Sequence, residues 1–351
     1  MTDPKRVLIV LPNWLGDIVM ALPSVAAARN HFASQHLAVA LPRAMTPVVR
    51  MLTGLDAVVS LEGGQDGFAS DVATLAGRKY DVAVLFPNSF RSAWMTYRAG
   101  IMERWGYAAD FRRLLLTRAV KRPRERGHHS NYYRTLLGKL KISIEGDVGN
   151  LVVTDSQRAR ATRLLERHKV ASGKSIVVMA PGAAHGHAKQ WLPERYAEVA
   201  RRSVTELGQS VVFVGGIDDR PVGRAIESFI TEAGHGLSDE RRIVNLIGHT
   251  DLTELIGILA KCEACVSNDT GAMHLAAVLS KPVVAVFGPS DERVTAPIGP
   301  HELLSHPVRC RPCLLRDCPI DHRCMTGIST NDVFSALVRC LNSNETKEAS
   351  S

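Results

Sequence analysis

The chain has 351 residues, of which 45% are hydrophobic and 22% are charged, with a formal net charge of +8. This composition is typical of a globular protein with room for two cores, and it excludes a collagen-like or disordered chain. No apolar run is long enough to cross a bilayer as a helix. The first apolar run, 6–12, is short and ends at Pro12, so we interpret it as a core strand rather than a signal peptide, which predicts a cytoplasmic protein.

The positive charge indicates an anionic partner, such as nucleic acid, phosphate groups or an acidic membrane face. A modest excess that only aids solubility is the alternative, and the distribution of the charge decides between them. The seven cysteines are an odd number, and no secretion signal accompanies them. A disulfide framework is therefore not expected.

Short valine-rich runs predict strands along the whole chain. They are 6–12, 36–41, 81–87, 175–181, 210–216, 263–269 and 282–289. Helical patterns lie between them, at 18–33, 69–78, 156–169, 194–207, 219–233, 251–261 and 271–279. Continuous apolar strands that alternate with helices predict an α/β fold with doubly wound parallel sheets.

This series runs twice, beginning at Val7 and again at Ile176. We therefore expect two Rossmann-like domains, 1–170 and 171–330, that face a central cleft and bind ligands at the carboxyl ends of their strands. The last segment, 331–351, is predicted to be a helix to about residue 345, with a disordered polar tail, NETKEASS.

The region 88–135 carries most of the positive excess. From Arg91 to Arg126 ten Lys and Arg residues face three acids, which leaves a local charge of +7. Aromatic residues interleave this region, among them Phe90, Trp94, Tyr97, Trp105, Tyr107, Tyr132 and Tyr133. Nucleic-acid binding would need a recognition motif such as an RRM or a helix-turn-helix, and the sequence contains neither. We therefore expect no nucleic-acid partner.

The first motif, PNWLGDIVMALP, spans residues 12–23. A strand ends at Pro12, a turn carries Gly16, and a helix is expected from about Asp17, whose free N–H groups would attract anions. Asp17 fits the role of an N-cap, and it also fits that of a general base in the cleft. The strand is not followed by GxGxxG, so dinucleotide binding has no support here.

The second motif, PGAAHGHAKQWLP, follows the strand that starts the second series. Gly182 and Gly186 allow the backbone to approach a ligand closely. Lys189 lies just before the next helix, as a point charge suited to phosphate. We expect Gly182 and Lys189 at a donor site rather than in a solvated loop.

The third motif, SNDTGAMHLAA, begins at Ser267 where another strand ends. Asp269 and Thr270 can cap the helix that starts at Gly271, and the same N–H groups can hold a pyrophosphate. His274 falls in the first turn and is expected to face the cleft. Two helix N-termini and a lysine in one domain predict a nucleotide site.

Two further groups give weaker signals. Asp218 and its neighbour Asp219 follow a strand, where an acid can bind a ribose hydroxyl or simply form a turn. Cysteines and a histidine in 310–324 are metal-ligand types, but their spacing beyond Cys313 fits no standard zinc pattern, so buried thiols are the favoured interpretation. The other CxxC pair, at 262–265, is expected in a helix end and a core strand.

Together the motifs resemble the lipopolysaccharide heptosyltransferase family. The matching stretches are PNWLGDIVMALP, LFPNSF, PGAAHGHAKQWLP, SNDTGAMHLAA and KPVVAVFGPS, in the order and spacing of the family. The resemblance implies a GT-B fold and inverting transfer of L-glycero-D-manno-heptose from ADP-heptose. The implied acceptor is the first heptose of the Kdo–lipid A inner core, so the enzyme would contact the cytoplasmic face of the inner membrane peripherally.

The resemblance also implies roles for single residues. Asp17 would be the catalytic base, Lys189 would contact the donor phosphates, and the motif from Asp269 to His274 would hold ADP and heptose. The other expected donor ligands are Gly182, Asp218, Thr270 and Gly271. The basic region is expected to bind the acidic acceptor through Asn13, Asn88, Ser89, Arg91, Arg98, Arg122 and Arg124.

No cofactor is expected, and the lack of a DxD pair indicates that a divalent metal is not essential. Two alternatives stay open at this point. A sugar-nucleotide epimerase can share the two-domain architecture, but it would need further acids and a second histidine in the cleft. A heptosyltransferase acting at another position of the core would carry the same motifs.

Overall fold

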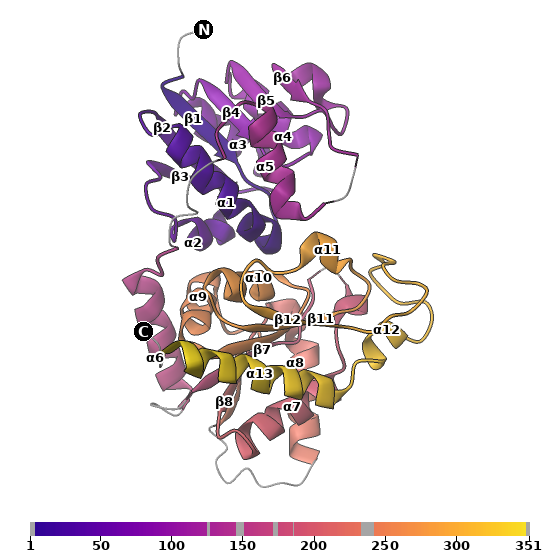
Figure 1. Cartoon of the computed structure of the whole chain (residues 1–351). Coiled ribbons are helices and arrows are strands. Elements are labelled where there is room, and N and C mark those ends of the chain that lie inside the picture. Colours follow the sequence, from indigo (N-terminus) through magenta and orange to yellow (C-terminus); the bar gives the residue numbers. More distant parts are fainter. Residues whose placement is uncertain are drawn as a thin grey trace. The chain divides into compact units, whose positions relative to one another are not determined.

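The computed structural model describes residues 4–124, 127–144, 151–170, 175–184, 186–232 and 242–348, with side chains to residue 343. The chain forms two compact units, one ending at Val152 and the other starting at Val153. Each unit is a six-stranded parallel sheet with helices packed against it (Figure 1). The α/β prediction is confirmed. Within the described residues no helix has both the length and the apolar character needed to cross a bilayer.

The first unit has the strand order β3-β2-β1-β4-β5-β6. Its strands are β1 (Arg6–Val10), β2 (His36–Pro42), β3 (Ala57–Leu61), β4 (Val82–Leu85), β5 (Glu103–Tyr107) and β6 (Arg118–Val120). Its helices are α1 (Leu15–His31), α2 (Thr46–Val49), α3 (Phe68–Ala76), α4 (Phe90–Arg98) and α5 (His129–Lys139), with short 3-10 turns η1 (Arg43–Met45) and η2 (Arg112–Leu115).

The centre of this sheet is β1, in which Val7, Leu8 and Ile9 are fully buried. Both faces of the strand are covered, because the side chains of these successive residues point to opposite faces and all of them are buried. A strand buried on both faces needs a continuous apolar run, which is why the sequence showed no alternation here. The order of the strands reverses between β1 and β4, the point at which doubly wound sheets bind ligands.

The second unit has the order β12-β11-β10-β7-β8-β9, which repeats that of the first unit. Its strands are β7 (Ile176–Ala180), β8 (Ser210–Phe213), β9 (Ile243–Asn245), β10 (Ala264–Asn268), β11 (Val283–Phe287) and β12 (His301–Ser305). Its helices are α6 (Asp155–Arg167), α7 (Pro193–Thr205), α8 (Arg220–Glu232), α9 (Leu252–Lys261), α10 (Gly271–Val278), α11 (Glu292–Thr295), α12 (Arg323–Thr326) and α13 (Thr330–Glu348), with 3-10 turns η3 (His187–Lys189) and η4 (Ile217–Asp219).

The boundary expected near residue 170 is wrong by one helix. Helix α6 begins with a capping box at Thr154, in which Gln157 returns the hydrogen bond. It then packs on α9 so closely that a Cβ on Gly257 would lie 2.2 Å from the carbonyl oxygen of Gln157. The helix therefore belongs to the second unit. The pattern of the sequence located the helix but not its partner.

Two other expectations are corrected. Helix α13 extends to Glu348, so the tail predicted to be disordered is helical over residues 344–348. The pattern also missed β3, β5, β6, β9 and β12. These are the outer strands of the sheets, and β5 and β12, with sequences ERWGY and HELLS, mix charged with apolar residues because part of each strand is not buried.

We predict that Gly257→Ala lowers the free energy of unfolding by about 2 kcal/mol, because the added methyl group overpacks the contact between α6 and α9. Thermal denaturation followed by circular dichroism measures this change. The matched control is Gly138→Ala on α5, where the Cβ meets no atom within 4 Å. Its stability should stay equal or rise by up to ~1 kcal/mol. Equal melting temperatures for both variants would contradict the close packing.

Candidate functional site

The two loops at the switch point of the second unit are joined by the buried side chain of Asn268, at the end of β10. Its Nδ2 donates to the carbonyl oxygens of Pro181 (2.7 Å) and Gly182 (3.2 Å) in the loop after β7. Its Oδ1 accepts from the backbone N–H of Trp191 (3.1 Å) and from the Tyr196 hydroxyl (3.0 Å). Burial raises the pKa of the Tyr196 phenol, which keeps this donor protonated. Both motif loops are thereby held in one arrangement.

Lys189 and Asp269 form an ion pair within this arrangement, with 2.6 Å between Nζ and Oδ2. The Asp269 side chain is only 5% exposed, whereas Lys189 is 20% exposed. The Thr295 hydroxyl donates to the same carboxylate oxygen at 3.4 Å. His274 is buried, and its Nε2 lies 4.0 Å from the other oxygen. Three of the predicted donor residues thus converge.

The expected capping role of Asp269 and Thr270 is wrong for their side chains. Thr270 does occupy the N-cap position of α10, with extended backbone, but it makes no capping hydrogen bond. Its hydroxyl lies 3.1 Å from that of Ser267, and Asp269 is engaged by Lys189. The first N–H groups of α10, from Gly271, therefore have no side-chain cap. Such groups beside a lysine form a site suited to a phosphate anion.

Gly182 is required because Asp219 fills the space beside it. A Cβ at residue 182 would lie 2.2 Å from the Asp219 carboxyl carbon. That carboxylate accepts from the backbone N–H groups of Ala183 (3.2 Å) and Gly216 (2.9 Å). Asp219 therefore ties the ends of β7 and β8 together as a structural group. Asp218, the predicted ribose ligand, is exposed in the turn η4.

The cysteine-rich segment, 310–324, makes hydrogen bonds to the backbone of the loop that carries Lys189. The N–H of Ala188 donates to the carbonyl oxygen of Arg316 at 2.9 Å, and the His322 ring nitrogen lies 2.7 Å from the carbonyl oxygen of Ala188. Gly186 has a φ of +125°, and a Cβ there would lie 2.3 Å from the Arg316 oxygen. Both backbone groups next to Lys189 are thus held by residues of 310–324.

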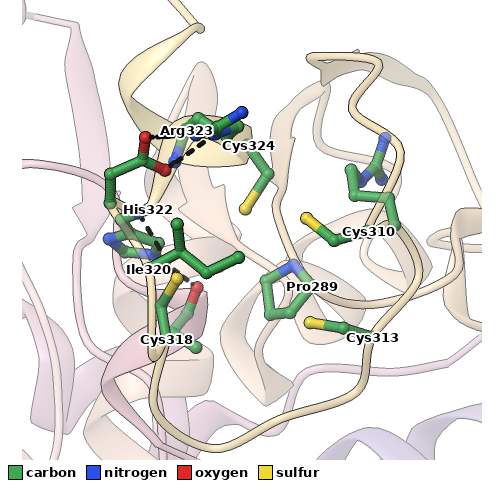
Figure 2. A pocket seen from close by; sticks show the side chains of 11 residues that line it. Pro289, Cys310, Cys313, Cys318, Ile320, His322, Arg323 and Cys324 are labelled. Carbon is green, nitrogen blue, oxygen red and sulfur yellow. Dashed lines mark hydrogen bonds and ion pairs between the residues drawn. The ribbon is translucent and has the colours of Figure 1, made fainter.

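The four cysteines of this segment surround one small pocket (Figure 2). Its volume is ≈ 20 Å³, enough for about one water molecule. Cys324 is buried, but Cys310 and Cys318 are exposed, so the expectation of buried thiols is wrong for these two. Among the described residues no three His, Cys, Asp or Glu side chains are grouped closely enough to hold a metal ion. The predicted burial of Cys262 and Cys265 is confirmed.

The first unit places Asp17 in the first turn of α1, which begins two residues earlier than expected, at Leu15. The N-cap is Trp14, so Asp17 is not a capping residue. Its Oδ1 lies 3.2 Å from Nδ1 of His129, the first residue of α5, and the two side chains are 29% and 42% exposed. An accessible carboxylate paired with an imidazole suits proton transfer. No motif in the sequence pointed to His129, because its pairing with Asp17 joins segments 112 residues apart.

Asn88 and Tyr132 lie next to this pair. The Asn88 amide nitrogen donates to the Tyr132 hydroxyl at 2.9 Å. The rings of His129 and Tyr132 are 6.4 Å apart. The Tyr107 hydroxyl donates to the Tyr132 carbonyl oxygen at 2.9 Å, and burial raises the pKa of Tyr107. The carboxyl ends of β4 and β5 and the start of α5 therefore build one polar surface.

Arg112 is fully buried beneath this surface. Its guanidinium donates to the carbonyl oxygens of Tyr107 (3.0 Å) and Ser89 (3.3 Å), to that of Pro87, and to the Ser92 hydroxyl (3.0 Å). Burial lowers the pKa of Arg112 to about 10, so the group still carries its charge at neutral pH. This arginine of the basic region is structural.

The other predicted acceptor residues are used in different ways. Arg91 lies 3.8 Å from the buried carboxylate of Asp71, and Arg98 lies over the ring of Trp94, 5.5 Å from its centroid. Ser89 caps α4 by accepting from the Ser92 N–H at 3.3 Å. Five of the predicted residues are exposed: Asn13, Ser89, Arg98, Arg122 and Arg124. The region is thus not a uniform cationic surface.

Comparison with known proteins agrees with this architecture. The model of glycosyltransferase family 9 (heptosyltransferase) matches residues 72–323. The chain is 28% identical over 311 residues to lipooligosaccharide heptosyltransferase 2 of Haemophilus influenzae, covering 84% of this chain and 86% of that protein. It is 26% identical over 313 residues to lipopolysaccharide heptosyltransferase 2 of Escherichia coli K12, covering 84% of this chain and 85% of that protein.

Among solved structures, ADP-heptose lps heptosyltransferase II of E. coli superposes with a TM-score of 0.79 at 24% identity. The match covers 97% of this chain and 99% of that chain. The expected GT-B fold is confirmed by this likeness together with the two six-stranded parallel sheets. The family match favours glycosyl transfer over the epimerase alternative.

We predict that Asn268→Ala lowers the free energy of unfolding by at least ~3 kcal/mol, because it leaves several buried donors and acceptors without partners. Urea denaturation measures the loss. Tyr196→Phe removes one of these bonds and should cost about 1 kcal/mol. Equal losses for the two variants would show that the Asn268 amide does not hold the loops together.

Proposed function

The chain belongs to glycosyltransferase family 9, the heptosyltransferases, and we propose that it transfers L-glycero-D-manno-heptose from ADP-heptose to the first heptose of a Kdo–lipid A inner core. The family and the relatives that act as heptosyltransferase 2 support heptose transfer in core biosynthesis. The single observation that carries the proposed chemistry is the ion pair of Lys189 with Asp269 beside the uncapped start of α10.

The second unit would bind the donor. Departure of ADP places negative charge on the diphosphate, and a lysine with helix N–H groups stabilises such charge without reorganisation. Lys189, Thr270 and Gly271 are the residues for this role. Asp269 holds the ammonium group of Lys189 in place before the donor binds, and His274 lies next to the Asp269 carboxylate. No residue in this scheme requires a metal ion or a cofactor.

The first unit would supply the base. Asp17 accepts the proton of the acceptor hydroxyl as that oxygen attacks the anomeric carbon on the face opposite ADP. His129 is proposed as a positioning residue, since its ring lies 3.2 Å from the Asp17 carboxylate. Asn88 and the exposed Arg122 and Arg124 are candidates for the acidic acceptor.

An acceptor of this kind is anchored in lipid. We therefore place the enzyme in the cytoplasm, in peripheral contact with the inner membrane, because this arrangement lets a nucleotide sugar and a lipid-linked core meet on one side of the bilayer. The acceptor itself is tested directly. Incubation with ADP-heptose and a series of truncated lipid A cores should give one product, heavier by one heptose, from the core that ends in the first heptose. Product from a different core would reassign the acceptor position.

We predict that Asp17→Asn reduces kcat about a hundredfold or more, because the amide accepts no proton. The affinity for ADP, measured by calorimetry, should stay nearly unchanged. His129→Ala should lower kcat less than Asp17→Asn does. A large loss of ADP affinity in Asp17→Asn would contradict the base role, since that residue would then belong to the donor site.

We predict that Lys189→Ala raises the Kd for ADP about tenfold and lowers turnover, because a charge-assisted hydrogen bond to the diphosphate is lost. Lys261→Ala is the matched control, since Lys261 is an exposed lysine at the end of α9 in the same unit. Its Kd for ADP should equal that of the native chain. Equal Kd values for ADP in the native chain and in both variants would contradict a place for Lys189 in the donor site.

A further inference from the structure

The loop after β5 presents two large apolar side chains to solvent. Phe111 is 99% exposed and Leu114 is 96% exposed, whereas large apolar residues of this size are mostly buried elsewhere in the first unit. Arg113 lies between them and is also exposed. Two apolar side chains and a cation that protrude together are the pattern of an interfacial membrane contact, and they have no role in the site described above.

The conformation of this loop is held firmly from beneath. Asp110 and Phe111 have φ values of +48° and +56°, a left-handed conformation that bulky residues rarely adopt. The Asp110 carboxylate accepts from the N–H of Phe90 at 2.6 Å. The residue after Phe111, Arg112, is buried and donates to backbone carbonyl oxygens at the ends of β4 and β5. An unusual backbone that is over-determined by its surroundings indicates a functional segment. Here its effect is to expose Phe111.

The charge around the loop is positive. The backbone N–H of Ala108 donates to the carbonyl oxygen of Val120 at 2.7 Å, so the chain leaves β5 and β6 at the same edge of the sheet. Lys121 and Arg122, directly after β6, are exposed there. Between residues 104 and 124 the one acid is Asp110, and its carboxylate is already engaged by the N–H of Phe90.

We propose that the loop 110–115, together with Lys121 and Arg122, docks the enzyme on an anionic lipid bilayer, with Phe111 and Leu114 inserted among the lipids. Apolar insertion and attraction of basic residues to acidic headgroups add to each other in such contacts. A second copy of this chain fits less well, because two basic surfaces would repel each other. The reason to expect a membrane contact rests on the proposed function, in which the acceptor is linked to lipid. Lipid binding itself is measured independently of transfer.

The test is sedimentation of the full chain with phosphatidylcholine vesicles, with and without phosphatidylglycerol. We expect binding to the anionic vesicles only, weakened by salt. The double variant Phe111→Asn with Leu114→Gln should bind at least about tenfold more weakly, since both apolar insertions are lost. Asparagine tolerates the left-handed backbone, so the variant should fold, and circular dichroism checks this.

Leu314→Asn is the matched control, because Leu314 is a leucine of the second unit that is 52% exposed and has a φ of +58°. Its vesicle binding should equal that of the native chain. Equal binding of the double variant and the native chain would overturn the proposal. So would a concentration-dependent dimer, seen by sedimentation velocity, that the double variant abolishes while neither protein binds vesicles.

The transfer assay separates this proposal from the proposed function. The double variant should keep the kcat of the native chain on a deacylated, soluble acceptor and lose turnover on the same acceptor embedded in vesicles. If native chain and variant transfer nothing to either acceptor but differ in vesicle binding, the proposed function fails and the docking surface stands. Equal turnover on the embedded acceptor would overturn the docking role.

Discussion

The candidate donor site depends on the amide of Asn268. A buried amide is costly unless both its donor and its acceptor are satisfied, and the four hydrogen bonds of this side chain satisfy them. They join the end of β10 to the loop after β7 and to the segment before α7. Lys189 and Asp269 lie on these two loops, so the distance between their charged groups follows from the Asn268 contacts. The start of α10 has no side-chain cap, because Asp269 pairs with Lys189 and the Thr270 hydroxyl lies against that of Ser267.

The first unit uses a comparable device with different chemistry. At the ends of parallel strands some backbone groups have no partner on a neighbouring strand. Arg112 satisfies such groups after β4 and β5 by donating to the carbonyl oxygens of Ser89 and Tyr107. In both units one buried polar side chain therefore fixes the loops at the carboxyl edge of the sheet. The residues to which we assign function, such as Asn88 in the first unit and Lys189 in the second, lie on the loops that these side chains hold in place.

The positive charge of the chain has several distinct uses. Arg112 is buried, Arg91 pairs with Asp71, and Arg98 lies on an aromatic ring. Exposed cations such as Arg113 and Arg122 remain for an anionic partner. A count of charges along the sequence therefore overstated the cationic surface, since burial and pairing decide which arginines a ligand can reach.

The sequence by itself determined the α/β class, the central strands and the loops that carry Asp17, Lys189 and Asp269, because apolar runs report burial and small polar motifs report turns. Only the tertiary structure decided what those residues contact. Lys189 and Asp269 are 80 residues apart, and Asp17 is 112 residues from His129. Which group satisfies a buried carboxylate, whether an arginine is core or surface, and which unit α6 joins all depend on contacts between distant segments. Local pattern reflects the preferences of neighbours in sequence, whereas these outcomes follow from the packing of the whole unit.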